Sequence, residues 1–174
     1  MIGYMFDTNI FNHILDGEVD ISLFKMKKKF YVTHLQLDEL NNTKDEIRRL
    51  ALLKVFQQIQ NIKVPTESAV WDVSKGDEAK FSDEETFVPT DSFVLGFSRL
   101  GMGRLSNGTL YAQILEALNK KKPKDKENNI KDTLIAETCI KNKFTLVTSD
   151  KALYEVAKEF NCNVLQFKEL IKNN

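Results

Sequence analysis

This chain of 174 residues is poor in several features that mark whole classes of protein. It has two cysteines, Cys139 and Cys162, and both fall in apolar-patterned segments, so we expect buried thiols rather than a disulfide framework. It has no apolar run long enough to span a membrane, and its first residues lack the basic stretch of a signal peptide. We therefore expect a protein of the reducing cytoplasm that does not enter a membrane.

An excess of charge of either sign is also missing, since 25 Lys and Arg residues balance 25 Asp and Glu residues. Strong non-specific binders of nucleic acid usually carry a basic excess, so the composition disfavours that class. Lysines gather at residues 25–29 and 120–126, and each cluster is a candidate local patch for RNA. The simpler interpretation, a solvated helix end and a solvated linker, is the favoured one.

Histidine is rare as well, with only His13 and His34 in the chain. Zinc sites use His or Cys ligands at short spacing, and these residues offer no such spacing with each other or with the cysteines. A metal-free ribonuclease would need paired histidines or similar acid–base groups, and the two histidines share no motif. Both classes are therefore disfavoured.

Short apolar segments alternate with amphipathic ones along the chain. We predict strands at residues 2–6, 30–33, 62–64, 145–148 and 162–167. We predict helices at 10–15, 35–62 (broken near 41–43), 109–118, 132–143, 151–160 and 168–172, with shorter helical turns at 21–25 and around Trp71. This alternation indicates right-handed strand–helix–strand units and a parallel sheet covered by helices on both faces.

The length suits a single domain over residues 1–174. The segment 74–129 is less regular than the rest of the chain. It is acidic at first, then punctuated by glycines, then helical, and finally a lysine-rich polar connection over 120–129. We interpret 74–129 as a mostly helical insertion or lid rather than a separate domain.

Two acids stand at the ends of predicted strands, Asp7 after 2–6 and Asp150 after 145–148. Ligands of open parallel sheets bind outside the carboxyl ends of the strands, where the strand order reverses. Each acid also precedes a predicted helix, so a helix N-cap is the alternative interpretation. For either acid taken alone, the cap is favoured.

Two further acids are harder to explain. Asp132 shares a helical face with apolar residues such as Ile135 and Cys139, so the helix carries it toward the core, although a cap stays an alternative. Glu39 follows Leu35 by four residues, and a cap does not explain it. A buried carboxylate is costly unless it is paired or binds a metal, and no Lys or Arg stands on either inward face as an obvious partner. Carboxylates without histidine suit Mg²⁺.

These acids and their neighbours resemble the four acidic motifs of the PIN-domain family. The motifs are Phe6-Asp7-Thr8-Asn9 after the first strand, Glu39 in Asp-Glu-Leu, Asp132-Thr-Leu-Ile-Ala-Glu, and Leu146-Val-Thr-Ser-Asp150. Their order, their strand and helix contexts and the C-terminal spacing agree with the family. The similarity covers the first and last thirds of the chain, and the middle departs from the compact members of the family.

The resemblance implies a three-layer α/β/α fold with a parallel sheet of about five strands. It implies a Mg²⁺- or Mn²⁺-dependent endoribonuclease whose catalytic metal ligands are Asp7, Glu39, Asp132 and Asp150. The supporting residues, two beside the first acid and two at the cleft floor near the fourth, would be Thr8, Asn9, Thr148 and Ser149. A metal-activated water would hydrolyse the phosphodiester bond, leaving a 5′-phosphate and a 3′-hydroxyl. Many PIN domains are toxins of type II toxin–antitoxin pairs, so the expected partners are RNA, an antitoxin protein and a second copy of the chain.

Other families begin in a similar way. A haloacid-dehalogenase-type phosphatase needs a second Asp two residues after the first, where this chain has Asn9. A receiver domain needs adjacent acids near its first strand, and these are absent. The main alternative is a PIN-like RNA-binding or scaffold module that keeps its acids with little or no nuclease activity. Glu137, five residues past Asp132, is expected to face elsewhere and is left outside the site.

Four carboxylates around one point repel one another when no cation is present, so at least one should have a raised pKa. On this basis, neutralising one of them, as in Asp150→Asn, is expected to raise the melting temperature of the metal-free protein near neutral pH. Bound Mn²⁺ should restore the stability that the repulsion removes.

Overall fold

The computed structural model describes residues 3–18, 29–59, 61–70, 73, 104–105 and 109–172. Their helices and strands follow in the order β1 (Gly3–Phe6), α1 (Thr8–Leu15), β2 (Lys29–Val32), α2 (His34–Asn41), α3 (Glu46–Gln58), β3 (Ile62–Lys63), β4 (Ala69–Val70), β5 (Arg104–Leu105), α4 (Thr109–Lys121), α5 (Lys126–Asn142), β6 (Thr145–Thr148), α6 (Lys151–Glu159), β7 (Asn163–Gln166) and α7 (Phe167–Lys172). The predicted alternation of strands and helices is confirmed. None of the helices in these residues is long and apolar enough to cross a lipid bilayer.

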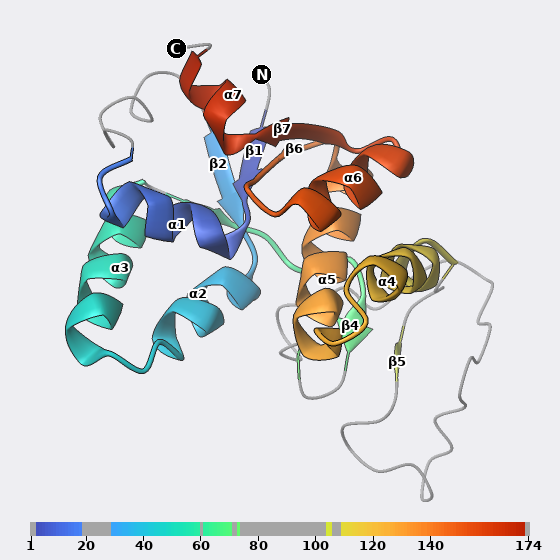
Figure 1. Cartoon of the computed structure of the whole chain (residues 1–174), viewed down its shortest axis with the longest axis horizontal. Coiled ribbons are helices and arrows are strands. Elements are labelled where there is room, and N and C mark those ends of the chain that lie inside the picture. Colours follow the sequence, from blue (N-terminus) through green and yellow to red (C-terminus); the bar gives the residue numbers. More distant parts are fainter. Residues whose placement is uncertain are drawn as a thin grey trace, which may run out of the picture.

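Five strands form one sheet in the order β3-β2-β1-β6-β7, and every neighbouring pair is parallel. The chain builds outward from β1 through β2 to β3, and then returns to the other side of β1 with β6 and β7 (Figure 1). The strand order therefore reverses between β1 and β6, which is where ligands of open parallel sheets bind. A separate antiparallel pair, β4 with β5, was not predicted from the sequence.

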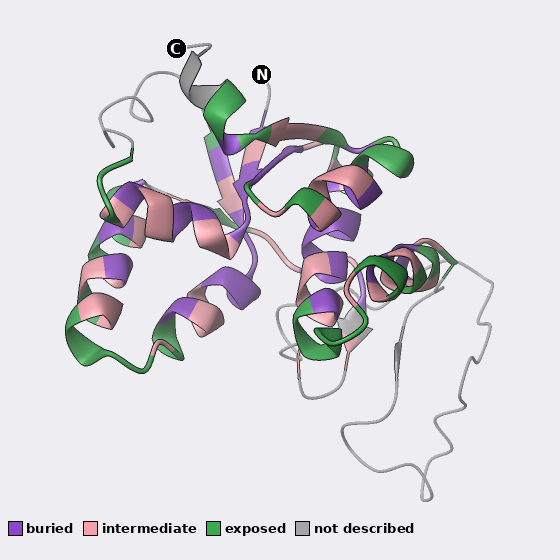
Figure 2. Ribbon diagram, viewed as in Figure 1, coloured by how far each residue is buried: buried purple, intermediate pink, exposed green. Residues whose placement is uncertain are grey.

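Helices cover both faces of this sheet. Helices α1, α3 and α7 contribute to the apolar cluster on one face, and α4, α5 and α6 to the cluster on the other (Figure 1). Helix α2 contributes Leu40 to the first cluster and Leu35 to the second. Successive residues of β1 serve opposite clusters, since Phe6 belongs to the first and Met5 to the second. Figure 2 shows the buried residues along the strands and on the inward sides of the helices. The predicted three-layer α/β/α arrangement is confirmed.

The prediction of a polar connection at 120–129 is wrong, because helices occupy most of this segment. Helix α4 continues to Lys121, and Pro123 follows at the point where its hydrogen bonding ends. Helix α5 begins at Lys126, and its first residues are exposed and polar, so they carry no apolar pattern. Asp132 consequently lies in the second turn of α5, which excludes the cap interpretation for this residue.

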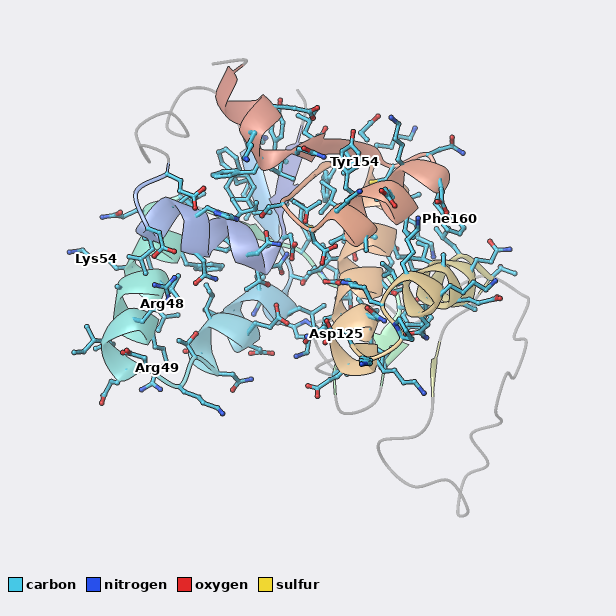
Figure 3. The ribbon with its side chains drawn as sticks, viewed as in Figure 1. Arg48, Arg49, Lys54, Asp125, Tyr154 and Phe160 are labelled. Carbon is cyan, nitrogen blue, oxygen red and sulfur yellow. The ribbon has the colours of Figure 1, made fainter. Side chains whose placement is uncertain are left out.

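Helix α3 buries only part of its apolar pattern. Ile47 and Leu50, which belong to that pattern together with Val55, are 83% and 60% exposed, whereas Val55 and Leu52 are buried. On its side facing α1, the guanidinium of Arg48 donates to both carboxylate oxygens of Asp16, at 2.9 and 3.0 Å (Figure 3). This bidentate pair ties α3 to the end of α1 on one face of the sheet.

The helical turns predicted at 21–25 and around Trp71 lie outside the described residues, as does most of 74–107. At the end of the segment 74–129, α4 and the start of α5 are helical. The insertion or lid over 74–129 and the single domain over 1–174 stay predictions.

Candidate functional site

The four acids of the PIN-like motifs come from four different elements and meet at the point where the strand order reverses. Asp7 follows β1, Glu39 lies on α2, Asp132 lies on α5, and Asp150 stands between β6 and α6. The carboxylates of Glu39, Asp132 and Asp150 are all near enough to raise the pKa of Asp7 by their charge. The fold therefore brings together the residues that the sequence singled out.

Asp7 is the most deeply buried of these acids, at 6% exposure. It stands at the N-cap position of α1, but its side chain makes no cap hydrogen bond. The hydroxyl of Thr148 donates to Asp7 Oδ2 at 2.7 Å instead. Burial, followed by the charge of Asp132, raises the pKa of Asp7 to about 8, although the Thr148 hydrogen bond acts in the opposite direction. The cap interpretation for Asp7 is thus wrong.

Glu39 is directed to the site by a buried glutamine on the same helix. Thr33 and Gln36 form a capping box at the start of α2, and Gln36 Nε2 donates to the carbonyl oxygen of Phe6 at 3.0 Å. This bond fixes the first turn of α2 against the end of β1. Glu39 follows one turn later, where its Oε2 accepts a hydrogen bond from the hydroxyl of Thr8. Thr8 was predicted to support Asp7, and it contacts Glu39.

Asp132 and Asp150 share a lysine. The Nζ of Lys122 lies 2.6 Å from Asp132 Oδ2 and 3.1 Å from Asp150 Oδ2. Burial raises the pKa of Asp132 to about 6, and the Lys122 charge opposes that rise. Burial acts to raise the pKa of Asp150 too, but the backbone N–H of Leu153 and the Lys122 ammonium together lower it. Asp150 therefore does cap α6, as the alternative interpretation held, and it also faces the site.

The expectation that no cation pairs with the inward acids is wrong. Besides Lys122, the Nζ of Lys131 on α5 lies 3.5 Å from Glu39 Oε1 and 3.3 Å from Glu127. Lys131 stands one residue before Asp132, and Lys122 is ten residues before it, so neither shares its helical face. A search for partners along one face of a helix could not find them.

The remaining predicted residues lie at the exposed edge of the site. The hydroxyl of Ser149 contacts Asn9 Oδ1 at 3.1 Å and His13 Nε2 at 2.7 Å, and His13 Nδ1 lies 2.8 Å from Glu18. Asn9 therefore contacts Ser149 rather than Asp7. His13 could not be found from the sequence, because its contact in the site is Ser149, which lies 136 residues later in the chain.

Glu137 faces away from the four acids, as expected. It is 1% exposed, pairs with Lys141 at 3.3 Å, and has its pKa raised by burial. Within the lysine cluster at 120–126, Lys120 pairs with Glu116 at 2.7 Å and Lys121 with Glu155 at 2.8 Å. These pairs favour the simpler interpretation of that cluster over an RNA patch.

The donor set suits a hard divalent cation, because it offers carboxylate and hydroxyl oxygens only. Among the described residues no cation forms an ion pair with Asp7, and a buried acid in that position favours a bound metal. As the side chains of these residues stand, no three His, Cys, Asp or Glu groups are arranged around one ion. Lys122 occupies the space between two of the four acids. The oxygen donors of the set thus fit Mg²⁺ or Mn²⁺ by their chemistry, although the side chains of the described residues are not gathered around one ion.

The chain matches no protein-family model, and no curated protein matches it. Among solved structures it is similar to a chain of VapBC2 from Rickettsia felis bound to a DNA fragment from their promoter, with a TM-score of 0.50 and 19% identity, over 95% of this chain and 98% of that chain. It is also similar to a chain of FitAcB from Neisseria gonorrhoeae, with a TM-score of 0.41 and 15% identity, over 93% of this chain and 96% of that one. The fold is PIN-like. At 19% identity the first likeness concerns the fold alone, and the second is too distant to add to it.

Proposed function

We propose that this chain is a Mg²⁺- or Mn²⁺-dependent endoribonuclease that hydrolyses RNA phosphodiester bonds. The observation that carries the proposal is the meeting of four carboxylates from four elements at the reversal of strand order. Asp7 is buried among them, and its pKa is raised first by that burial and then by the charge of its neighbours. A structural role alone would pair each buried acid with a cation, and Asp7 has none among the described residues.

In this proposal Asp7, Glu39, Asp132 and Asp150 would hold the metal, which when bound supplies an activated water and offsets charge on the phosphate. The chain's own hydroxyls position these acids. Thr148 donates to Asp7 and accepts from the backbone N–H of Asp150 at 2.9 Å, so it holds the two strand-end acids together.

The pocket beside Glu39 offers space for a bound chain of RNA. It has a volume of about 310 Å³ and is lined by residues of α2 and α5 together with Val73. Its lining includes three acids, Asp38, Glu39 and Glu127, together with Lys131. The amide side chains of Asn41 and Asn42 also line it, and they can donate to phosphates and both donate to and accept from bases. We propose that RNA lies across this pocket on its way to the acids.

We further propose that the chain is the toxin of a toxin–antitoxin pair in the cytoplasm, with an antitoxin protein and a second copy of itself as partners. The likeness to a chain of the Rickettsia felis VapBC2 complex supports the antitoxin partner alone, because that complex is a toxin–antitoxin assembly. The fold supplies this support, since the shared identity is low.

One observation favours the second candidate, a PIN-like RNA-binding or scaffold module with little nuclease activity. Lys122 and Lys131 already contact three of the four acids, and a lysine that neutralises a carboxylate lowers its need for a metal.

Cleavage assays with matched variants distinguish the two candidates. The full chain is incubated with a panel of RNAs in Mn²⁺ and in chelator, and Asp132→Asn is compared with Asp125→Asn, which changes an exposed acid just before the same helix. The nuclease proposal expects cleavage in Mn²⁺ alone, loss of at least about 100-fold in Asp132→Asn, and wild-type rates in Asp125→Asn. Equal rates in Mn²⁺ and chelator, or in Asp132→Asn and wild type, would overturn it. Binding of RNA without cleavage would favour the module.

A further inference from the structure

Lys122 has a position that an ordinary surface lysine lacks. Its ammonium group touches Asp132 and Asp150 together, and its side chain is only 17% exposed. By contrast, its neighbour Lys121 pairs with Glu155 and Glu159 at 33% exposure, on the outer side of α6. The two lysines are adjacent in sequence, but only Lys122 reaches the acids of the site.

Hydrogen bonds hold the backbone of Lys122 in place, in addition to the ion pairs of its ammonium group. Its N–H donates to the carbonyl oxygen of Leu118 at 2.7 Å, which extends the hydrogen bonding of α4 by one residue. Its carbonyl oxygen accepts from Nδ2 of the buried Asn129 at 2.8 Å. Pro123 then prevents any continuation of the helix. The side chain therefore starts from a fixed point and ends between two carboxylates.

The charges of the site add to this geometry. If a bound cation keeps all four carboxylates ionised, they carry four negative charges. The ammonium groups of Lys122 and Lys131 supply two positive ones, and Lys131 is shared with Glu127. The remainder equals the charge of a single divalent ion. Of the four acids, Asp7 has no cation beside it among the described residues, so the uncompensated charge lies on the Asp7 side of the site.

Nucleases that use two metal ions place them a few ångströms apart, on either side of the phosphate. We propose that Lys122 takes the place of a second divalent ion, so that this chain holds a single metal on the Asp7 side and uses the ammonium group as a fixed cation on the Asp132 side. The inference rests on the proposed nuclease function and adds to it the number of ions and the role of this lysine. It also changes the ligand set, because the single ion is assigned to the Asp7 side while Asp132 and Asp150 contact Lys122.

Mn²⁺ titrations of the intact chain, followed by calorimetry and by the electron paramagnetic resonance signal of free Mn²⁺, test the inference. We expect one Mn²⁺ per wild-type chain. Lys122→Met removes the ammonium while keeping most of the length of the side chain, and it should admit a second Mn²⁺. Lys122→Arg keeps the charge and should restore the single ion. Lys121→Met is the matched control, since it removes an ammonium of the outer surface, and it should titrate like wild type.

The outcomes separate this inference from the function on which it rests. A wild-type chain that binds two Mn²⁺ ions overturns the role of Lys122 and leaves the nuclease proposal standing. A wild-type chain that binds none overturns both. A Lys122→Met chain that still binds one ion with unchanged affinity overturns the inference. One ion bound about tenfold more tightly also overturns it, because Lys122 would then compete with the metal for the same acids. If circular dichroism shows that Lys122→Met does not fold, the test rests on the other two proteins. Wild type and Lys122→Arg should then each bind one Mn²⁺ ion, and two bound ions in either protein would overturn the inference.

Discussion

The two halves of the acidic centre use the same kind of side chain but hold it in different ways. On one side, hydroxyl groups contact the carboxylates, Thr148 that of Asp7 and Thr8 that of Glu39. A hydroxyl donor satisfies part of a buried carboxylate without cancelling its charge. The pKa of Asp7 accordingly stays raised, to about 8.

On the other side, the ammonium group of Lys122 lies between Asp132 and Asp150. A full positive charge offsets repulsion that a hydroxyl cannot, so burial raises the pKa of Asp132 only to about 6, and the pKa of Asp150 is lowered. The difference teaches that four acids of one motif set are not equivalent. Asp7 has no cation beside it among the described residues, whereas Lys131 contacts Glu39 at 3.5 Å and Lys122 lies between Asp132 and Asp150.

Binding of a metal should change the Asp7 half most. At a Mn²⁺ concentration about 100 times its dissociation constant, binding stabilises the fold by about 2.7 kcal/mol, or roughly 5–10 °C in melting temperature. Asp7→Asn should lose most of this increase, and Asp125→Asn, at the exposed start of α5, should keep it. Melting curves of the three proteins in Mn²⁺ and in chelator provide the measurement. An equal increase in all three would place the ion away from Asp7.

Without metal, neutralising one acid in each half should have opposite effects. Asp7 stabilises the fold fully below its unfolded pKa of 3.8, and this contribution is lost as pH rises toward the folded value of about 8. In chelator at pH 8, Asp7→Asn should therefore raise the melting temperature, by roughly 5 °C. Near pH 4 the gain should disappear.

Asp150→Asn should lower the melting temperature under the same conditions, because the variant loses the ion pair with Lys122. Asn caps a helix about as well as Asp, so the lost pair sets the cost, at about 1.5 kcal/mol or roughly 4 °C. This reverses the expectation from crowding alone, which treated Asp150 as an unpaired charge. Two variants that move in the same direction at pH 8 would contradict the division into halves.

Thr148 connects the halves, and its loss should have a smaller effect. Thr148→Val removes the donor to Asp7 and the acceptor of the Asp150 N–H, at a cost of about 1 kcal/mol. The same change at the other end of β6, Thr145→Val, lies away from the acids and is the control. Urea denaturation of both variants is the measurement. Equal losses of stability in the two variants would mean that the contacts of Thr148 with Asp7 and Asp150 add no stability of their own.

The smallest effect is expected outside both halves. Lys121→Met removes exposed ion pairs with Glu155 and Glu159, which solvent and salt screen. Its melting temperature should match that of wild type at 0.15 M salt within the error of the measurement. A loss as large as that of Asp150→Asn would mean that the surface pairs of α4 and α6 matter as much as the site.

Strand and helix order could be predicted from the sequence because the pattern of each element is local. The segment Thr145–Thr148 is apolar and short, and its bounds were found in full. The start of α5 was missed, because its exposed first turn has no apolar residue facing the core. Ile47 and Leu50 have helical spacing, but both are exposed. The face of α3 that is buried depends on how the helix packs against distant parts of the chain, and the local sequence does not determine it.

The acids of the site could be proposed because each belongs to a short motif with a defined place at a strand end or on a helix. Their partners could not. Lys122 reaches Asp150 across 28 residues, and Thr8 reaches Glu39 across 31, so only the assembled sheet brings them together. The lysine also stood in a polar stretch that resembled a linker, and nothing local distinguished it from Lys120 or Lys121.

The hydrogen bond from Thr148 to Asp7 joins residues 141 positions apart, which imposes an order of assembly on the site during protein synthesis. Strand β1 leaves the ribosome first, but it gains its neighbour on one side only when β6 has been made. Closing so long a loop is slow compared with local contacts. A nascent chain therefore carries Asp7 and Glu39 without Asp132 and Asp150. As a nuclease it would stay inactive toward the RNA being translated until residue 150 has emerged.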